Sequence, residues 1–279
     1  MNEPVRETIP LSQGAVSCLS WKGDGPVLHF AHANGFNAET YRTLLSPLTN
    51  RLRVFASDAR GHGGTTLSTA PGMQQGWTIF RDDLIAVLDR IAPDGAFLAG
   101  HSMGATASLM VAALRPEKVR ALVLVEPVLM PKDVPPGDNE LARRAEKRRD
   151  AFASVDEAFT FYRGRGAFKT WPDDMLRDYL TGGLEQTDDG FRLSCRPAWE
   201  AGDFRSTPSG VSQCAARLRC PVTLIHATDG TASEKEVAIF KQLCPTTRVV
   251  TRADATHFLP MELPDLVRDE ITQIVGRAV

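Results

Sequence analysis

The feature that most constrains this chain is a serine between two glycines at the junction of two apolar segments. Residues 96–99 form a short apolar run that favours a buried strand, and residues 103–114 are rich in Ala, Leu and Met, which favours a packed helix. Ser102 lies between them in the pattern Gly-His-Ser-Met-Gly over residues 100–104. Small flanking residues allow a sharp turn that presents a hydroxyl. The sequence therefore predicts a nucleophile turn whose helix points its N-terminus toward Ser102.

Apolar strands and helical patterns alternate through most of the chain. Strands are expected at residues 16–21, 27–30, 52–56, 96–99, 121–125, 221–226 and 248–251, and helices at 39–48, 77–91, 103–114, 233–243 and 263–275. Continuously apolar strands are typical of a mostly parallel sheet covered by helices on both faces, which makes this an α/β fold. Ligand sites in such sheets lie beyond the carboxyl ends of the strands, where Asn34, Ser102 and Glu126 fall.

The alternation breaks between residues 127 and 212. A linker rich in Pro and Gly is followed by helical patterns at 139–152, 155–163 and 173–180. We interpret residues 127–212 as a helical cap, or lid, inserted over the strand ends, with residues 1–126 and 213–279 as the core. The first helix carries a basic run, which we interpret as a solvated face with acidic partners at helical spacing. The alternative is that it holds a carboxylate or phosphate of the substrate. Aromatic residues of the cap are candidates for an apolar acyl site.

Composition argues against several classes of protein. A net charge of −2 over 279 residues gives no reason to expect nucleic acid or an anionic membrane as a partner. The N-terminus lacks the pattern of a signal peptide and no run of about 18 apolar residues occurs, so we expect a cytoplasmic location. Five scattered cysteines without metal-ligand spacing predict reduced thiols. We expect a small-molecule substrate with an apolar acyl or aromatic part, and neither a metal nor an organic cofactor.

A serine hydroxyl is a weak nucleophile near neutral pH and needs a general base, for which imidazole has a suitable pKa. Among six histidines, His257 lies late in the chain, in a polar segment between the last predicted strand and the last helix. We expect its ring to reach Ser102. His29, His101 and His226 lie in or beside apolar strands and are expected to be structural.

The order of four motifs resembles the α/β-hydrolase superfamily over essentially the whole chain. They are His-Ala-Asn-Gly at 32–35, Asp-Ala-Arg-Gly-His-Gly at 58–63, Gly-His-Ser-Met-Gly at 100–104 and Thr-His-Phe at 256–258. The resemblance implies an eight-stranded, mostly parallel sheet with a helical cap inserted after strand six. It implies Ser102 as the nucleophile of a catalytic triad, His257 as the base, and an oxyanion hole formed by the backbone N–H groups of Met103 and Asn34. The family usually has His-Gly where this chain has His32-Ala33.

The third member of the triad has two candidates. The family usually places an acid after strand seven, where this chain has Asp229, one residue earlier than the usual spacing. Some members take the acid from the end of strand six, the position of Glu126. We favour Glu126, because the carboxylate must meet the ring N–H directly to fix the tautomer of the histidine. A shift of its loop would allow Asp229 to serve instead.

These residues favour a serine hydrolase, carboxylesterase-like, that cleaves a small carboxylic ester through an acyl-enzyme on Ser102. A thioester, a lactone or an amide would be a variant substrate of the same reaction. Carbon-carbon bond hydrolysis and a cofactor-free perhydrolase reaction would use the same triad, and a ligand-binding receptor with slow turnover is an alternative from another class. A serine suits attack on acyl carbon, whereas the family's epoxide hydrolases and haloalkane dehalogenases attack with an aspartate.

Overall fold

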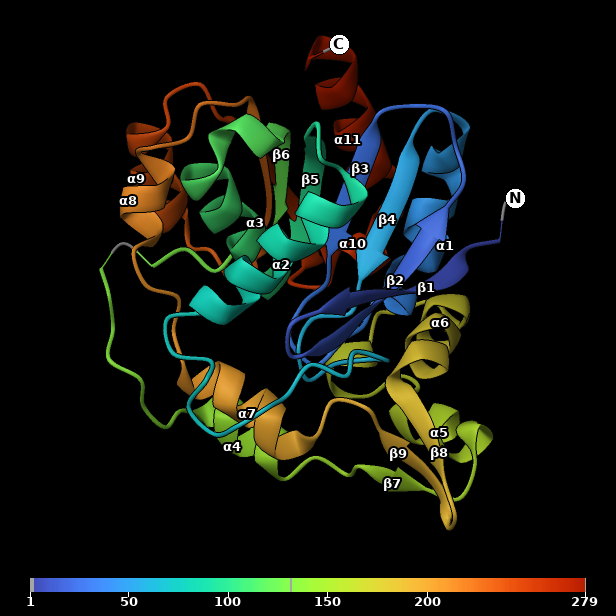
Figure 1. Ribbon diagram of the computed structural model, residues 1–279. Coiled ribbons are helices and arrows are strands. Elements are labelled where there is room, and N and C mark those ends of the chain that lie inside the picture. The colour runs from blue at the N-terminus through green and yellow to red at the C-terminus, as the bar shows by residue number, and fades with distance from the viewer. Residues whose placement is uncertain (1–2, 131, 279) are drawn as a thin grey trace.

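The structure is a computed structural model that describes residues 3–130 and 132–278. Its main sheet is built from eight strands: β1 (Val5–Leu11), β2 (Gly14–Trp21), β3 (Val27–Ala31), β4 (Arg53–Ser57), β5 (Ala96–His101), β6 (Val119–Val125), β10 (Val222–Asp229) and β11 (Arg248–Thr256). Their order across the sheet is β1-β2-β4-β3-β5-β6-β10-β11 (Figure 1). The pairs β1 with β2 and β2 with β4 are antiparallel, and the other pairs are parallel. The predicted α/β architecture is confirmed.

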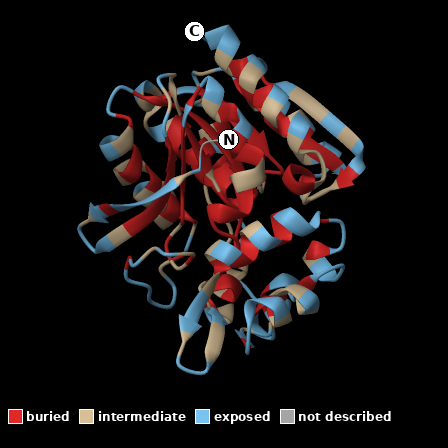
Figure 2. Ribbon diagram, turned by 90° about the vertical axis from the view of Figure 1, so that its right-hand side faces the viewer, coloured by how far each residue is buried: buried red, intermediate tan, exposed pale blue. Residues whose placement is uncertain are grey.

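Helices cover both faces of this sheet. The helices of the core are α1 (Arg42–Leu45), α2 (Thr78–Ile91), α3 (Met103–Leu114), α8 (Val211–Ala215), α9 (Glu234–Leu243), α10 (Leu259–Glu262) and α11 (Pro264–Ala278). One apolar cluster joins α2, α3, α8 and α9 to one face, and another joins α1 and α11 to the opposite face. Along β5, for example, Leu98 lies in the first cluster whereas Phe97 and Ala99 lie in the second. This alternation buries both faces, which Figure 2 shows as a continuous buried centre.

The segment predicted as a cap lies across one end of the sheet (Figure 1). Its helices are α4 (Glu140–Glu146), α5 (Val155–Tyr162), α6 (Asp173–Gly183) and α7 (Pro197–Arg205). They are joined by a small sheet in the order β7-β9-β8, made of β7 (Ala151–Phe152), β8 (Leu184–Thr187) and β9 (Gly190–Leu193). The sequence did not indicate this sheet. Its strands are two to four residues long, too short for a periodic pattern to identify.

Two predicted helices differ from the structure. The helix expected over residues 39–48 is divided into the 3-10 turns Glu39–Tyr41 and Ser46–Asn50 on either side of α1. Pro47 lies in the second turn and cannot supply the N–H that an α-helix interior needs. The helix expected over 139–152 ends at Glu146, because Phe152 is instead buried in the small sheet, where it pairs with Phe191. The remaining 3-10 turns are Pro116–Lys118 and Gly166–Phe168.

Candidate active site

Ser102 lies on a strained turn between β5 and α3, with φ 52° and ψ −117°. The two glycines of its motif make this turn possible. A Cβ on Gly104 would lie 2.2 Å from the backbone oxygen of Ala31, and a Cβ on Gly100 would lie 2.7 Å from the backbone of Gly104. A residue other than glycine keeps a positive φ only where its surroundings hold it in that conformation. Here the Ser102 N–H donates to the Val125 carbonyl at 2.9 Å, which helps to hold the turn. Ser102 retains 9% of its exposure.

The predicted oxyanion hole consists of two backbone N–H groups, those of Met103 and Asn34. Met103 is the first residue of α3, so its N–H has no partner within the helix. Among the described residues, the backbone N–H groups of Met103 and Asn34 donate to no acceptor. The Asn34 side chain, by contrast, is occupied: its Nδ2 donates to the Glu200 carbonyl of α7 at 3.1 Å.

The direction of the Asn34 N–H is set by the preceding carbonyl. The Ala33 carbonyl accepts from the Phe36 N–H at 3.1 Å and from His32 Nδ1 at 2.8 Å. Because a peptide unit is planar, fixing this carbonyl also fixes the Asn34 N–H on its other side. His32 Nε2 in turn accepts from the Ala59 N–H at 2.8 Å. Burial lowers the pKa of His32, which keeps the ring neutral and able to accept.

A second neutral histidine holds the same loop from the motif at 58–63. His62 Nδ1 lies 3.0 Å from the Arg60 carbonyl, and its Nε2 accepts from the Gly35 N–H at 3.0 Å. Burial lowers the pKa of His62 to about 3. Arg60 forms a bidentate ion pair with Asp83. These residues brace residues 32–36, which we call the oxyanion loop after the role predicted for Asn34.

His257 follows β11 and is the predicted base. Its Nδ1 lies 2.6 Å from the Thr231 Oγ1 and 3.3 Å from the Glu126 Oε2. Its ring centroid is 4.8 Å from that of His101, the residue before Ser102. No hydrogen bond joins Ser102 to the ring within the part of the chain that the structure describes, and such bonds often tighten only when substrate binds. The side chain of His257 is 26% exposed.

Glu126 occupies the carboxyl end of β6 and is fully buried, with φ 50°. Its carboxylate accepts from the backbone N–H groups of Ala227 at 2.5 Å and Thr231 at 2.7 Å. A Cβ on Gly230 would lie 2.3 Å from one of the carboxylate oxygens, so the turn after β10 can wrap this carboxylate only with glycine there. These two bonds and the close turn hold the Glu126 carboxyl group in one position.

Asp229 lies on the exposed end of β10. Its backbone pairs with Thr256, after a shift in register between Ala227 and Asp229. No contact between its side chain and His257 occurs among the described residues. Of the two predicted acids, the structure therefore brings only Glu126 next to the ring.

Thr231 is a residue of this site that sequence reasoning missed. Its N–H donates to Glu126 and its hydroxyl meets His257, so it contacts both ends of the pair. The only signal in the sequence is Gly230, which follows Asp229 and permits the close approach of the backbone to Glu126.

The basic run of the cap divides into two groups. Arg143, Arg144 and Arg149 form exposed ion pairs with nearby carboxylates, as predicted for a solvated face. Arg148 is instead largely buried: its guanidinium donates to Glu200 Oε2 at 2.9 Å and to the hydroxyl of Tyr179. Glu200 links this buried arginine to the oxyanion loop, because its carboxylate pairs with Arg148 and its backbone carbonyl accepts from the Asn34 side chain.

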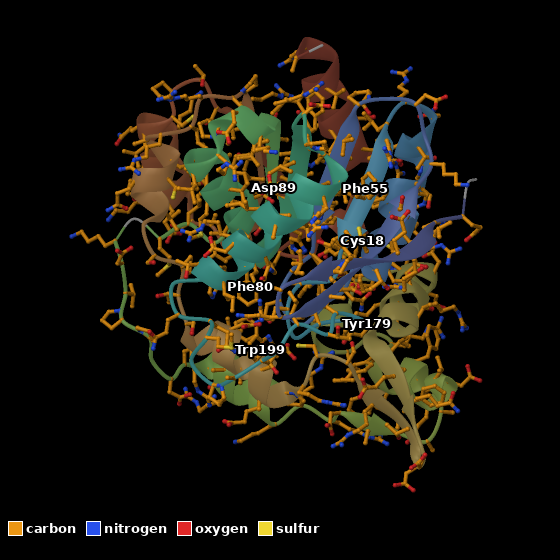
Figure 3. The ribbon with its side chains drawn as sticks, in the orientation of Figure 1. Cys18, Phe55, Phe80, Asp89, Tyr179 and Trp199 are labelled. Carbon is orange, nitrogen blue, oxygen red and sulfur yellow. The ribbon has the colours of Figure 1, made fainter. Side chains whose placement is uncertain are left out.

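Aromatic rings from the cap meet the loops of the site. Phe36 packs edge-on against Trp171 with centroids 5.2 Å apart, and against Tyr179 at 5.8 Å. Trp171 also contacts Phe258, which follows the base, at 5.9 Å. Figure 3 shows Tyr179 and Trp199 at the junction of cap and core, where the Trp199 indole N–H donates to the Arg60 carbonyl at 3.1 Å. On the side of the cap, the loops of the site therefore meet both aromatic rings and the polar groups of Arg148 and Glu200.

Together, the sheet topology and the strained turn at Ser102 define the class of the protein as a mostly parallel α/β fold with a sharp strand-to-helix turn. Residues 26–264 match the family model described as alpha/beta hydrolase fold, and the chain belongs to this family. Within the described residues, none of the helices has both the length and the apolar character needed to cross a bilayer.

Known proteins of two kinds resemble this chain. It is 26% identical over 255 residues to 2-(acetamidomethylene)succinate hydrolase of Mesorhizobium japonicum, and the aligned region covers 91% of this chain and 89% of that protein. A crystal structure of E-2-(acetamidomethylene)succinate hydrolase superposes with a TM-score of 0.81 at 23% identity, over 98% of this chain and 100% of that one. The chain is also 32% identical to esterase Rv0045c of Mycobacterium tuberculosis over 126 residues, 45% of this chain and 41% of that protein.

Proposed function

We propose that this hydrolase cleaves a small carboxylic ester by a serine acyl-enzyme mechanism. Ser102 Oγ attacks the acyl carbon while His257 Nε2 takes its proton. The tetrahedral oxyanion is held by the N–H groups of Met103 and Asn34. His257 then gives the proton to the leaving alcohol, and water activated by the same ring releases the acid. A thioester or lactone would follow the same course.

One observation carries this proposal, namely the engagement of His257 Nδ1 by Thr231 and Glu126. Two oxygen atoms facing Nδ1 favour the tautomer that carries its proton there. In that tautomer Nε2 has a free lone pair, which is the state that a general base for Ser102 requires.

We further propose Glu126 as the triad acid. It is buried, it is held by two backbone N–H groups, and it lies 3.3 Å from the ring nitrogen. Asp229 is exposed and would have to leave its place on β10 to reach the ring.

A second candidate is hydrolysis of an amide that carries carboxylate groups. The name of the relative from Mesorhizobium describes a substrate with an acetamido group and a succinate, that is, an amide and two carboxylates. Arg148 is the buried cationic group through which this chain would hold such a substrate, provided that a substrate carboxylate replaces Glu200 as the partner of its guanidinium. The same triad would attack the amide carbonyl.

Steady-state hydrolysis of matched esters tests both candidates. The panel contains p-nitrophenyl acetate, butyrate and octanoate, p-nitrophenyl hemisuccinate and an N-acetyl enamide bearing two carboxylates. Turnover of any ester that is absent in Ser102→Ala supports the serine hydrolase. A preference for the hemisuccinate or the enamide that is lost in Arg148→Met selects the second candidate. Binding of these compounds without turnover would contradict both and favour a receptor.

A further inference from the structure

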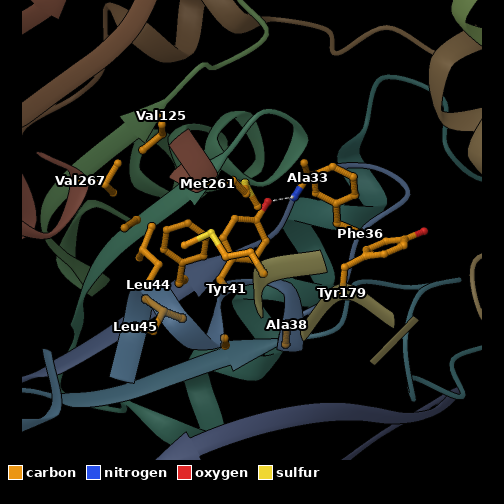
Figure 4. Packing of buried hydrophobic residues seen from close by; sticks show 14 of the residues in the cluster. Ala33, Phe36, Ala38, Tyr41, Leu44, Leu45, Val125, Tyr179, Met261 and Val267 are labelled. Carbon is orange, nitrogen blue, oxygen red and sulfur yellow. Dashed lines mark hydrogen bonds between the residues drawn. The ribbon is translucent and has the colours of Figure 1, made fainter. Parts of the chain in front are cut away.

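Three hydrogen bonds join the oxyanion loop to the backbone of His257 through two buried side chains. The Ala33 N–H donates to Tyr41 Oη at 3.2 Å, a bond drawn in Figure 4. Tyr41 Oη lies 2.8 Å from His101 Nδ1, and His101 Nε2 lies 2.7 Å from the His257 carbonyl oxygen. We call Tyr41 and His101 the buried relay.

The chemistry of the partners fixes the direction of every bond in the relay. A carbonyl oxygen only accepts, so His101 must carry a proton on Nε2. Burial lowers the pKa of His101 well below its usual value, and the nearby His257 lowers it further, so the ring is neutral. His101 Nδ1 therefore accepts a hydrogen bond from the Tyr41 hydroxyl, whose oxygen in turn accepts one from the Ala33 N–H.

The relay lies among apolar groups, which makes its geometry restrictive. His101 is fully buried and Tyr41 is 1% exposed. The Tyr41 ring packs 4.6 Å from that of Phe30, and Figure 4 shows it beside Leu44, Leu45 and Met261. A polar group left without a partner in such surroundings is costly, so all three bonds are strongly favoured together.

We propose that Tyr41 and His101 are positioning residues that hold the oxyanion donor and the base at a fixed separation around Ser102. This inference rests on the proposed function. At one end the relay fixes the N–H of Ala33, whose carbonyl is already held by His32, so both peptide units beside Ala33 are fixed and the Asn34 N–H with them. At the other end it fixes the carbonyl of His257, the residue that carries the ring.

Kinetics of relay variants test this proposal. In Tyr41→Phe we expect kcat to fall about 10-fold with little change in KM, since misplaced groups affect the transition state more than ground-state binding. In His101→Leu we expect a similar or larger fall. His101→Gln retains an amide N–H near the position of Nε2 and should recover part of the loss. The assay is ester hydrolysis, supported by the rate of Ser102 labelling with a fluorophosphonate.

The control is His29→Gln, which replaces another fully buried histidine. His29 lies within β3, three residues before the oxyanion loop, and its ring bonds to Ser57 Oγ at 2.8 Å rather than to a residue of the relay. This variant should lose stability but keep the wild-type kcat. The proposal is overturned if Tyr41→Phe and His101→Leu keep wild-type kcat, or if His29→Gln loses as much kcat as they do.

Nitrogen-15 NMR of the imidazoles measures the protonation state and tautomer of His101, which would not depend on Tyr41 if the two side chains only packed together. We expect the His101 signals of a neutral ring protonated on Nε2, with an Nδ1 shift that changes in Tyr41→Phe. A charged ring, or a proton on Nδ1, would overturn the relay. If the wild type took no fluorophosphonate, the proposed function would fail, whereas this NMR measurement would still decide the hydrogen bonds of the relay.

Discussion

At the scale of single residues, the pairing of His257 with Glu126 makes the sharpest prediction. Glu126→Gln keeps the size of the side chain but removes the charge that stabilises the imidazolium and favours the reactive tautomer. We expect kcat to fall about 10³-fold or more, by analogy with the loss of a triad acid elsewhere. Asp229→Asn is the matched control and should change kcat by less than about 3-fold. The reverse order in ester hydrolysis assays would assign the acid to Asp229.

Thr231 is expected to contribute less, because it offers His257 a neutral acceptor. Thr231→Val keeps the branched shape and the backbone bond to Glu126 but removes the hydroxyl that lies 2.6 Å from Nδ1. One neutral hydrogen bond is worth about 0.5–1.5 kcal/mol, so kcat should fall roughly 2- to 10-fold. Thr231→Ser retains a hydroxyl and should keep most of the wild-type kcat. Equal activity of the valine and wild-type enzymes would show that the hydroxyl has no role.

Asp203 on α7 predicts a pH dependence of stability. It is fully buried, and the polar neighbours of its carboxyl group are only weakly engaged: the Gln74 side chain and, at 3.8 Å, His62 Nε2. Burial, with the charge of Glu200 adding to it, raises the pKa of Asp203 well above its usual value. The native state therefore keeps this proton while the unfolded chain releases it near pH 4. As pH rises from about 4, this residue lowers the free energy of unfolding.

Asp203→Asn removes that ionisation. We expect the variant to have a higher Tm than the wild type at pH 7. The increase should be at least about 2 °C for each kcal/mol by which the free energy of unfolding rises. The difference should shrink toward pH 4, where the wild-type carboxyl is protonated in both states. Thermal unfolding at the two pH values measures it. A constant difference across this range would show that Asp203 does not titrate as described.

The residues of the site differ in how clearly the sequence alone identifies them. Ser102 is marked by the steric demand for glycine on both sides, which leaves a clear pattern. Glu126 was favoured for its place at the end of a strand. Thr231 leaves no comparable mark, because its role depends on how the turn after β10 folds back over a carboxylate 105 residues earlier in the chain.

At the scale of elements, the predictable part of the fold was the part buried on both faces. β5 over residues 96–99 and β6 over residues 121–125 are continuously apolar, so their sequence identifies them without reference to neighbours. β1 was missed because six of its seven residues keep substantial exposure and include charged side chains. The interrupted helix around α1 reflects Pro47, a local signal that the apolar pattern masked.

The close packing of the strand-turn-helix unit at Ser102 predicts that a methyl group added at Gly104 destabilises the protein, whereas one added at an uncrowded helix position does not. In Gly104→Ala the new Cβ would meet the Ala31 carbonyl oxygen at 2.2 Å, a clash with rigid backbone that should cost about 3 kcal/mol or more. Gly276→Ala on α11 is the control: nothing lies within 4 Å of its Cβ, and alanine there should stabilise by about 0.5–1 kcal/mol. Urea unfolding measures both changes. Similar stability for the two variants would contradict the close approach at Gly104.

At the scale of the whole molecule, one edge of the sheet collects every part of the site. The oxyanion loop follows β3, Ser102 follows β5, Glu126 follows β6 and His257 follows β11, so parallel strands bring together residues that are far apart in sequence. The segment predicted as a cap lies over these strand ends and bonds directly to the core, for example from Asn37 Nδ2 to the Tyr179 carbonyl at 3.0 Å (Figure 1). Long-range assembly of this kind follows from topology, which the alternation of strands and helices indicated.

The most direct test of the account is to ask whether Ser102 is an activated nucleophile. Wild type, Ser102→Ala and His257→Gln would each be treated with a fluorophosphonate and analysed by intact mass and peptide mapping. We predict a single adduct on Ser102 in the wild type, none in Ser102→Ala, and much slower labelling in His257→Gln. A wild type that takes no adduct, or takes it on another residue, would contradict the serine hydrolase assignment.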